Sequence, residues 1–224
     1  MTSQTLQLDT AQSDESLQRL SSAFAALAPG DTLTLEALAH PRKLTRRFSE
    51  AAWGQFDWIP LAEAGGRWRV EVRKRDTPGP ASISAFLGAD HRRCDGFYAE
   101  AEESARANDA ARAAERFARF ETCLLRHMAM EEEALFAELD HRMGFAGEGP
   151  TAVMREEHEQ LRGLLTRLRD CVEGGDLASF ADVCETLLVL MEQHNMKEEE
   201  LLYPLMDEAF AGEEESLLKQ LVTF

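Results

Sequence analysis

Hydrophobic and polar positions alternate over the first third of the chain and follow a helical period after it. Alternation of apolar and polar side chains indicates strands, and apolar side chains three or four positions apart indicate helices. Two glycines between the last two alternating segments predict a hairpin. The expected strands are residues 5–9, 32–38, 56–63 and 67–75, and the expected helices are residues 14–27 and 44–53. Their order predicts a small two-layer βαβαββ domain over residues 1–75.

Residues 76–82 contain two prolines and one glycine and predict a linker. Strand signals vanish beyond it, and four amphipathic segments joined by short connections predict an all-α antiparallel four-helix bundle over residues 83–210. The expected helices are about residues 83–107, 110–140, 151–172 and 177–210. Residues 211–224 predict a C-terminal amphipathic tail that packs on either domain. The fold class is thus α+β with two domains.

The net charge of −17 is confined to the helical part of the chain. Residues 1–78 carry 10 basic and 10 acidic side chains, whereas the remainder carries 14 basic and 31 acidic ones. This difference supports two domains, and the acidity argues against a nucleic-acid partner, whose phosphates attract Lys and Arg. With no signal-like start and no apolar run of about 18 residues, we expect a cytoplasmic protein without a membrane partner.

The helical part repeats itself after 67 positions. This shift superposes His91 on His158, His127 on His194, and Glu131 on Glu198. The first two helices therefore recur as the last two, and a pseudo-twofold axis would bring the repeated groups together in the middle of the bundle. All six residues lie on apolar helical stripes, which face a core.

Four imidazoles and two carboxylates buried together need compensation, because an unpaired buried carboxylate costs several kcal/mol. One or two divalent cations would supply it. The i, i+4 spacing of each His–Glu pair lets both side chains reach one metal, or lets the glutamate bridge to a second. Imidazole with carboxylate suits iron, with manganese and zinc as alternatives. Two histidines per ion and two bridging glutamates would leave about two positions on each six-coordinate ion for an oxo bridge, water, O2 or NO.

The motifs "DHRRCDGF", "HMAMEEEALF", "EEHEQLRGLL" and "HNMKEEELLYP" resemble the hemerythrin family, in its bacterial HHE cation-binding branch. The resemblance implies a non-haem di-iron centre of two oxo- or hydroxo-bridged ions. The implied ligands are His91, His127, Glu131, His158, His194 and Glu198. The ferritin-like alternative requires Glu-x-x-His on two helices, which this chain lacks. Arg162 stands where the oxygen-carrying members have a fifth histidine, so reversible oxygen carriage is not expected.

The first hypothesis is a di-iron protein that binds or reacts with O2, NO or peroxide in sensing, scavenging or redox chemistry, rather than a turnover enzyme. One alternative is an iron donor for iron–sulfur cluster repair under nitrosative or oxidative stress, and another is a metal-free acidic interaction bundle. In the first domain, the segments "AHPRKLTRRF", "FDWIPL" and "WRVEVRK" resemble an uncharacterised bacterial domain with the fold of small sulfur carriers. We expect this domain to bind a protein partner. His40 is a candidate ligand, acid–base group or turn residue. The sequence leaves a homodimer open.

Several neighbours of the candidate ligands complete the expectations. Asp90, Glu156 and Glu157 are candidates to hydrogen-bond the free nitrogen of a ligand imidazole, and Tyr98 is a candidate hydroxyl near the site. The other acids of the two repeated runs, Glu132, Glu133, Glu199 and Glu200, are expected on a solvated face. Three of the four cysteines, Cys94, Cys123 and Cys184, match apolar positions of the repeat and are expected to be reduced core residues. Cys94 also lies one turn from His91 and is a candidate oxidation sensor.

Overall fold

The computed structural model describes residues 4–9, 13–145 and 147–224. The chain divides into two compact units, Met1–Ala81 with Glu213–Phe224 and Ser82–Gly212. The first contains a sheet with helices and the second is helical, which confirms the α+β two-domain class.

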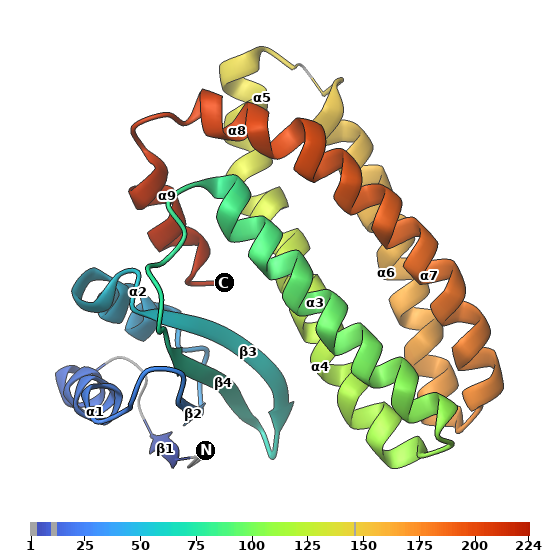
Figure 1. The fold of residues 1–224 in the computed structure, drawn as a ribbon, viewed down its shortest axis with the longest axis horizontal. Helices are drawn as coiled ribbons and strands as arrows, with labels where there is room; N and C mark the ends of the chain where they lie inside the picture. The colour runs from blue at the N-terminus through green and yellow to red at the C-terminus, as the bar shows by residue number, and fades with distance from the viewer. Residues whose placement is uncertain (1–3, 10–12, 146) are drawn as a thin grey trace. The chain divides into compact units, whose positions relative to one another are not determined.

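The α/β unit has the predicted βαβαββ order (Figure 1). Its sheet runs in the order β1-β2-β4-β3, with β1 parallel to β2 and the other pairs antiparallel. The register places Leu35 opposite both Leu6 and Val70, so apolar side chains of neighbouring strands meet. The elements are β1 (Gln4–Leu8), α1 (Asp14–Ala25), β2 (Thr32–Ala37), α2 (Arg42–Ala52), β3 (Phe56–Ala64) and β4 (Arg67–Lys74).

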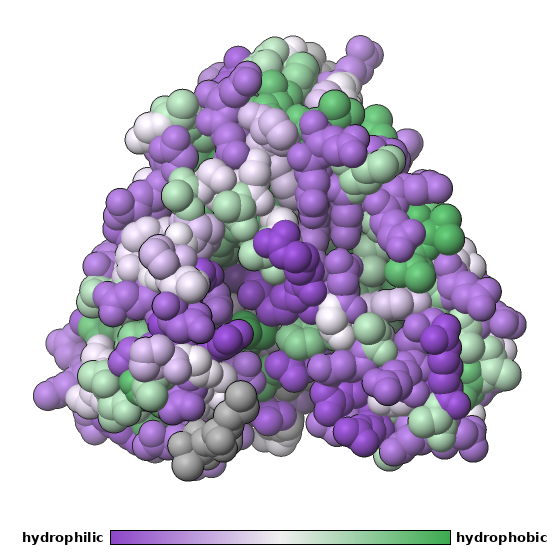
Figure 2. Space-filling model, in the orientation of Figure 1, coloured by the Kyte–Doolittle hydropathy of each residue, from purple (hydrophilic) through white to green (hydrophobic). Residues whose placement is uncertain are grey.

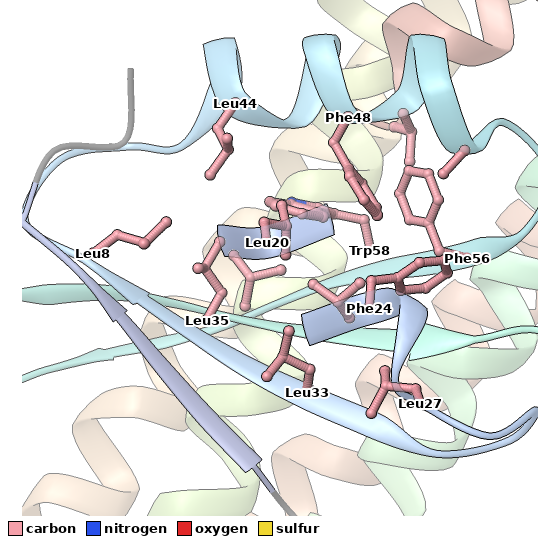
Figure 3. Close-up of a cluster of buried hydrophobic side chains, with 14 residues drawn as sticks. Leu8, Leu20, Phe24, Leu27, Leu33, Leu35, Leu44, Phe48, Phe56 and Trp58 are labelled. Atoms are coloured by element: carbon pink, nitrogen blue, oxygen red, sulfur yellow. The ribbon is translucent and has the colours of Figure 1, made fainter. Parts of the chain in front are cut away.

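One apolar cluster forms the core of this unit (Figure 3). Leu20 and Phe24 of α1 and Phe48 of α2 pack with side chains of the sheet. The rings of Phe24 and Phe48 meet edge to face with centroids 5.1 Å apart, a favoured aromatic geometry. The C-terminal helix α9 (Glu214–Leu221) contacts α2, and Val222 joins the same cluster. The C-terminal tail therefore belongs to the α/β unit.

The helical unit consists of two long hairpins, α3 with α4 and α6 with α7 (Figure 1). Polar side chains cap the starts of three of its long helices, at Ser82, Asp109 and Asp176. Asp109 and Asp176, which the 67-residue repeat superposes, accept hydrogen bonds from the backbone N–H groups of Arg112 and Ser179. The elements are α3 (Ile83–Arg106), α4 (Ala110–Met130), η1 (Glu131–Phe136), α5 (Ala137–Met143), α6 (Pro150–Gly174), α7 (Leu177–Lys197), η2 (Glu198–Leu202) and α8 (Tyr203–Ala209).

The second and fourth long helices are not the uninterrupted α-helices that the sequence predicts. Each contains one stretch of π-helix, η1 or η2, and these begin at Glu131 and Glu198. In η2 the backbone N–H of Tyr203 donates to the carbonyl of Glu198, five residues earlier. Apolar periodicity does not reveal such a turn, because the flanking helix continues with nearly the same pattern. Single π turns of this kind are frequent at functional sites.

Hydrophilic residues cover most of the face shown in Figure 2, and apolar residues are scattered over it. Within the described residues, no helix is both long and apolar enough to cross a membrane.

Candidate metal centre

The structure brings the six candidate ligands together inside the helical unit, although they come from α3, α4, η1, α6, α7 and η2. The histidines form two pairs. In the first pair, the ring centroids of His91 and His127 are 4.4 Å apart, and in the second pair those of His158 and His194 are 4.9 Å apart. All six side chains are at most 3% exposed.

The two glutamates lie between the histidine pairs, and each turns one oxygen toward each pair. Glu131 places Oε1 3.5 Å from His127 Nε2 and Oε2 3.2 Å from His158 Nε2. Glu198 places Oε2 3.2 Å from His91 Nε2 and Oε1 3.2 Å from His194 Nε2. This arrangement has the symmetry that the repeat predicts, and it suits carboxylates that bridge two ions.

All four imidazoles turn Nε2 inward and Nδ1 outward to a carboxylate. The Nδ1 contacts are His91 with Glu199 at 2.8 Å, His127 with Asp90 at 3.1 Å, His158 with Glu132 at 2.7 Å and His194 with Glu157 at 3.0 Å. Ionised carboxylates only accept hydrogen bonds, so Nδ1 carries the proton in each contact. A neutral imidazole that is protonated at Nδ1 has a free lone pair on its inward Nε2 atom for a cation.

Two of these outer carboxylates correct the expectation of a purely solvated acidic face. Glu132 is half-buried and binds an imidazole, and Glu199 binds one although it is exposed like Glu133 and Glu200 of the same acidic runs. Glu132 and Glu199 directly follow the inward-facing glutamates, at positions that a helical projection alone assigns to the outer flank. Each reaches a histidine on a neighbouring helix, and the sequence of one helix contains no signal for such a contact.

For both Glu131 and His127, burial shifts the pKa in one direction, and the contacts with neighbouring side chains shift it in the other. Burial alone would raise the pKa of Glu131, but the contacts with His127 and His158 together outweigh it and hold this pKa well below its ordinary range. Burial alone would lower the pKa of His127, but Glu131 raises it. The glutamates are therefore ionised at neutral pH, as metal binding requires.

Tyr203 is the functional candidate that the sequence did not single out. Its hydroxyl is fully buried and its single proton is shared between two acceptors, Glu131 Oε1 at 2.8 Å and Glu198 Oε2 at 3.0 Å. The same oxygen lies 3.0 Å from His91 Nε2. Burial and the two glutamates raise the pKa of Tyr203 well above its usual value, so the hydroxyl keeps its proton. The only sequence signal is that the repeat superposes this tyrosine on Phe136.

The second histidine pair has no equivalent hydroxyl, because Phe136 stacks on His158 with ring centroids 5.8 Å apart. The inward atoms of this half face one another at 3.2 Å across each histidine–glutamate contact, but none of them makes a hydrogen bond to a described residue. These buried atoms are His158 Nε2, His194 Nε2, Glu131 Oε2 and Glu198 Oε1. Buried polar atoms are rarely left unpaired, and four that converge on one point fit a cation.

Other residues that the sequence singled out lie elsewhere. Arg162 donates to Glu132 Oε2 at 2.8 Å, and so it supports the carboxylate that holds His158. Tyr98 donates to the backbone carbonyl of Cys184 at 2.9 Å and not to the candidate ligands. Glu156 is exposed. In the α/β unit, His40 Nδ1 accepts from the backbone N–H of Arg42 at 3.1 Å, as a turn residue at the start of α2 does.

The geometry defines a cation-binding helical bundle with two sets of nitrogen and oxygen donors. The family model of the hemerythrin HHE cation-binding domain matches residues 82–206, more than half of the chain. The chain belongs to this family, as its motifs predict. The comparison with curated proteins found no match, and neither did the comparison with solved structures.

Proposed function

We propose that the helical unit holds two iron ions and that these ions bind or react with a small oxidant of the class O2, NO or peroxide. The observation that carries the proposal is the convergence of four buried atoms without a hydrogen-bond partner among the described residues, from His158, His194, Glu131 and Glu198. In the other half, the equivalent atoms of His91, His127 and the two glutamates surround the Tyr203 hydroxyl. Manganese or zinc would suit the same donors less specifically. Bound iron would supply one-electron redox chemistry, and the protein would act as sensor, scavenger or redox protein.

The residues of this chain would have distinct roles. The four Nε2 atoms and the carboxylates of Glu131 and Glu198 would hold the ions, and the two carboxylates would balance their charge. The outer carboxylates keep each ring protonated at Nδ1 and fix its orientation. Burial of the six side chains excludes bulk water, so only small molecules reach the centre.

Metal analysis of untagged protein from iron-replete cells tests the proposal. Plasma mass spectrometry is expected to find about two iron ions per chain, as in other di-iron bundles, together with near-ultraviolet absorption typical of an oxo bridge. The spectrum is expected to change when the reduced protein meets O2 or NO. A well-folded protein without stoichiometric metal would instead support an acidic interaction bundle, and iron that leaves for an apo cluster protein without a spectral response would support an iron donor.

Replacement of Glu132 by alanine is expected to weaken metal binding roughly 10–100-fold, since carboxylates that orient ligand imidazoles have effects of this size. The variant loses the acceptor 2.7 Å from His158 Nδ1. Competition with a chelator measures the affinity. The neighbouring Glu133→Ala variant removes an exposed carboxylate of the same run and is the control. Equal affinities of the two variants would contradict the assigned role.

Replacement of Tyr203 by phenylalanine is expected to destabilise the metal-free protein by about 1–3 kcal/mol, because two buried carboxylates lose their hydroxyl donor. The cost is expected to be smaller in the metal-loaded protein, where the ions neutralise the same oxygens. Denaturant unfolding with and without metal measures both values. Tyr98→Phe is the control, since its hydroxyl binds a backbone carbonyl and its effect should not depend on metal. A cost for Tyr203→Phe that is independent of metal would refute this account.

A further inference from the structure

A pair of thiols lies in the interface between α3 and α4, outside the candidate metal centre. The Sγ atoms of Cys94 and Cys123 are 2.6 Å apart. Both side chains are buried, at 2% and 3% exposure. From the sequence alone, each cysteine is expected to be a separate core residue, because 28 residues lie between them. Only the register of the two helices brings their side chains together.

Asp90 is the third potential metal ligand of this cluster, but the charges around it disfavour a cation. Its Oδ1 accepts from Arg126 at 3.1 Å and also pairs with Arg93, while its Oδ2 accepts from His127 at 3.1 Å. The carboxylate is thus already used, and two guanidinium groups stand close to the thiols. Such surroundings favour negative charge on sulfur over a bound cation.

The same surroundings favour thiol oxidation. The hydrogen bond with Cys94, together with Arg93 and Arg126, lowers the pKa of Cys123 below its ordinary value, whereas burial and the contact with Cys123 raise the pKa of Cys94 well above its own. Cys123 is therefore the thiol of the pair that ionises first. A disulfide needs two sulfur atoms about 2.05 Å apart, and these two are already inside van der Waals contact, so closure requires little movement. A buried pair excludes large oxidants, which leaves small neutral molecules as the class that reaches it.

We propose that Cys94 and Cys123 form a redox-active dithiol, which a peroxide converts to a disulfide between α3 and α4. With hydrogen peroxide, the first thiol gives up its proton, its sulfur attacks one oxygen and breaks the O–O bond, and a sulfenic acid and one water result. The second thiol then displaces the hydroxyl as a second water and forms the S–S bond. Sulfur loses two electrons and the peroxide gains them. An external thiol reverses the reaction by exchange.

The position of the pair gives the link a structural consequence. Cys94 lies one helical turn after His91, and Cys123 lies one turn before His127. A disulfide would therefore tie together the two helices that carry the first histidine pair. The dithiol does not depend on a bound metal, because none of its contacts uses a candidate ligand nitrogen that faces inward.

Peptide mapping of the full-length protein tests the proposal. The reduced chain, both as purified and after chelation, is treated with hydrogen peroxide and digested with trypsin without reduction. Trypsin releases Cys94 in residues 94–106 and Cys123 in residues 120–126, each without another cysteine. We expect a linked pair of these peptides in most chains and its loss on treatment with dithiothreitol. The double variant Cys171→Ser/Cys184→Ser should still form the link.

One result of the peptide mapping would overturn the proposal. In that result, the folded wild-type chain is oxidised at the partly exposed Cys171, but no disulfide joins peptide 94–106 to peptide 120–126. Because the wild-type chain alone decides this, a folding defect of Cys94→Ser or Cys123→Ser would not obscure the answer. If the link forms in the chelated protein, the dithiol proposal stands even if no iron is found at the metal centre.

Discussion

Replacement of His127 by alanine is expected to lower the iron content from about two ions per chain to a small fraction of that value. The variant removes the Nε2 atom that faces Glu131 and Tyr203. Both glutamates contact both histidine pairs, so an ion lost from one half deprives the other of charge balance across the shared carboxylates. His194→Ala, in the other half, is therefore expected to release both ions as well.

Plasma mass spectrometry of the purified variants checks this expectation, with circular dichroism to confirm that each is folded. His127→Gln provides a second variant of more similar volume in case the alanine variant unfolds. His141→Ala is the matched control, because His141 is an exposed histidine of the same helical unit, in α5. Undiminished iron in a folded His127→Gln protein would rule out His127 as a ligand.

Replacement of Asp90 by alanine is expected to lower the free energy of unfolding by about 3–5 kcal/mol, the cost of leaving a buried charge unpaired. Asp90 is fully buried and accepts from Arg126, whose side chain is 5% exposed and remains behind without its partner. Urea unfolding of chelated protein measures the loss without a contribution from bound metal. Removal of the second charge in Asp90→Ala/Arg126→Met is expected to restore much of the stability.

The pair Glu100–Arg116 provides a matched control, since it also joins α3 to α4 but at the surface. Its carboxylate is 45% exposed, so Glu100→Ala is expected to cost at most about 1 kcal/mol. Equal costs for Asp90→Ala and Glu100→Ala would show that the buried network contributes no more than a surface ion pair.

Apart from the two π-helical stretches, the alternation and helical periods of the sequence were sufficient to predict the order of strands and helices in both units. They were sufficient because each period reports which side of a single element is apolar. They also placed His91, His127, His158, His194 and both glutamates on inward faces, where the structure has them. The 67-residue repeat added the expectation of a shared centre, because two copies of one hairpin bury their equivalent faces against each other.

Contacts between helices could not be predicted in the same way. Glu132 and Glu199 were expected on a solvated face, and Glu199 is indeed exposed, but the sequence did not predict that each binds an imidazole of another helix. The pairing of Cys94 with Cys123 has the same origin, since the axial register of α3 against α4 decides which side chains meet. Periodicity within one helix contains no information about that register.

The position of the Tyr203 hydroxyl is a further feature that the sequence did not predict. In an unbroken α-helix, residues five positions apart point in different directions, so the sequence does not associate Tyr203 with Glu198. The π turn that starts at Glu198 changes the direction of the following side chains, and the hydroxyl reaches the carboxylates and His91. The sequence by itself determined the elements, their apolar faces and the six inward donors. The tertiary structure decided which atoms meet across helices, because those contacts depend on helix register and on local changes of helical pitch.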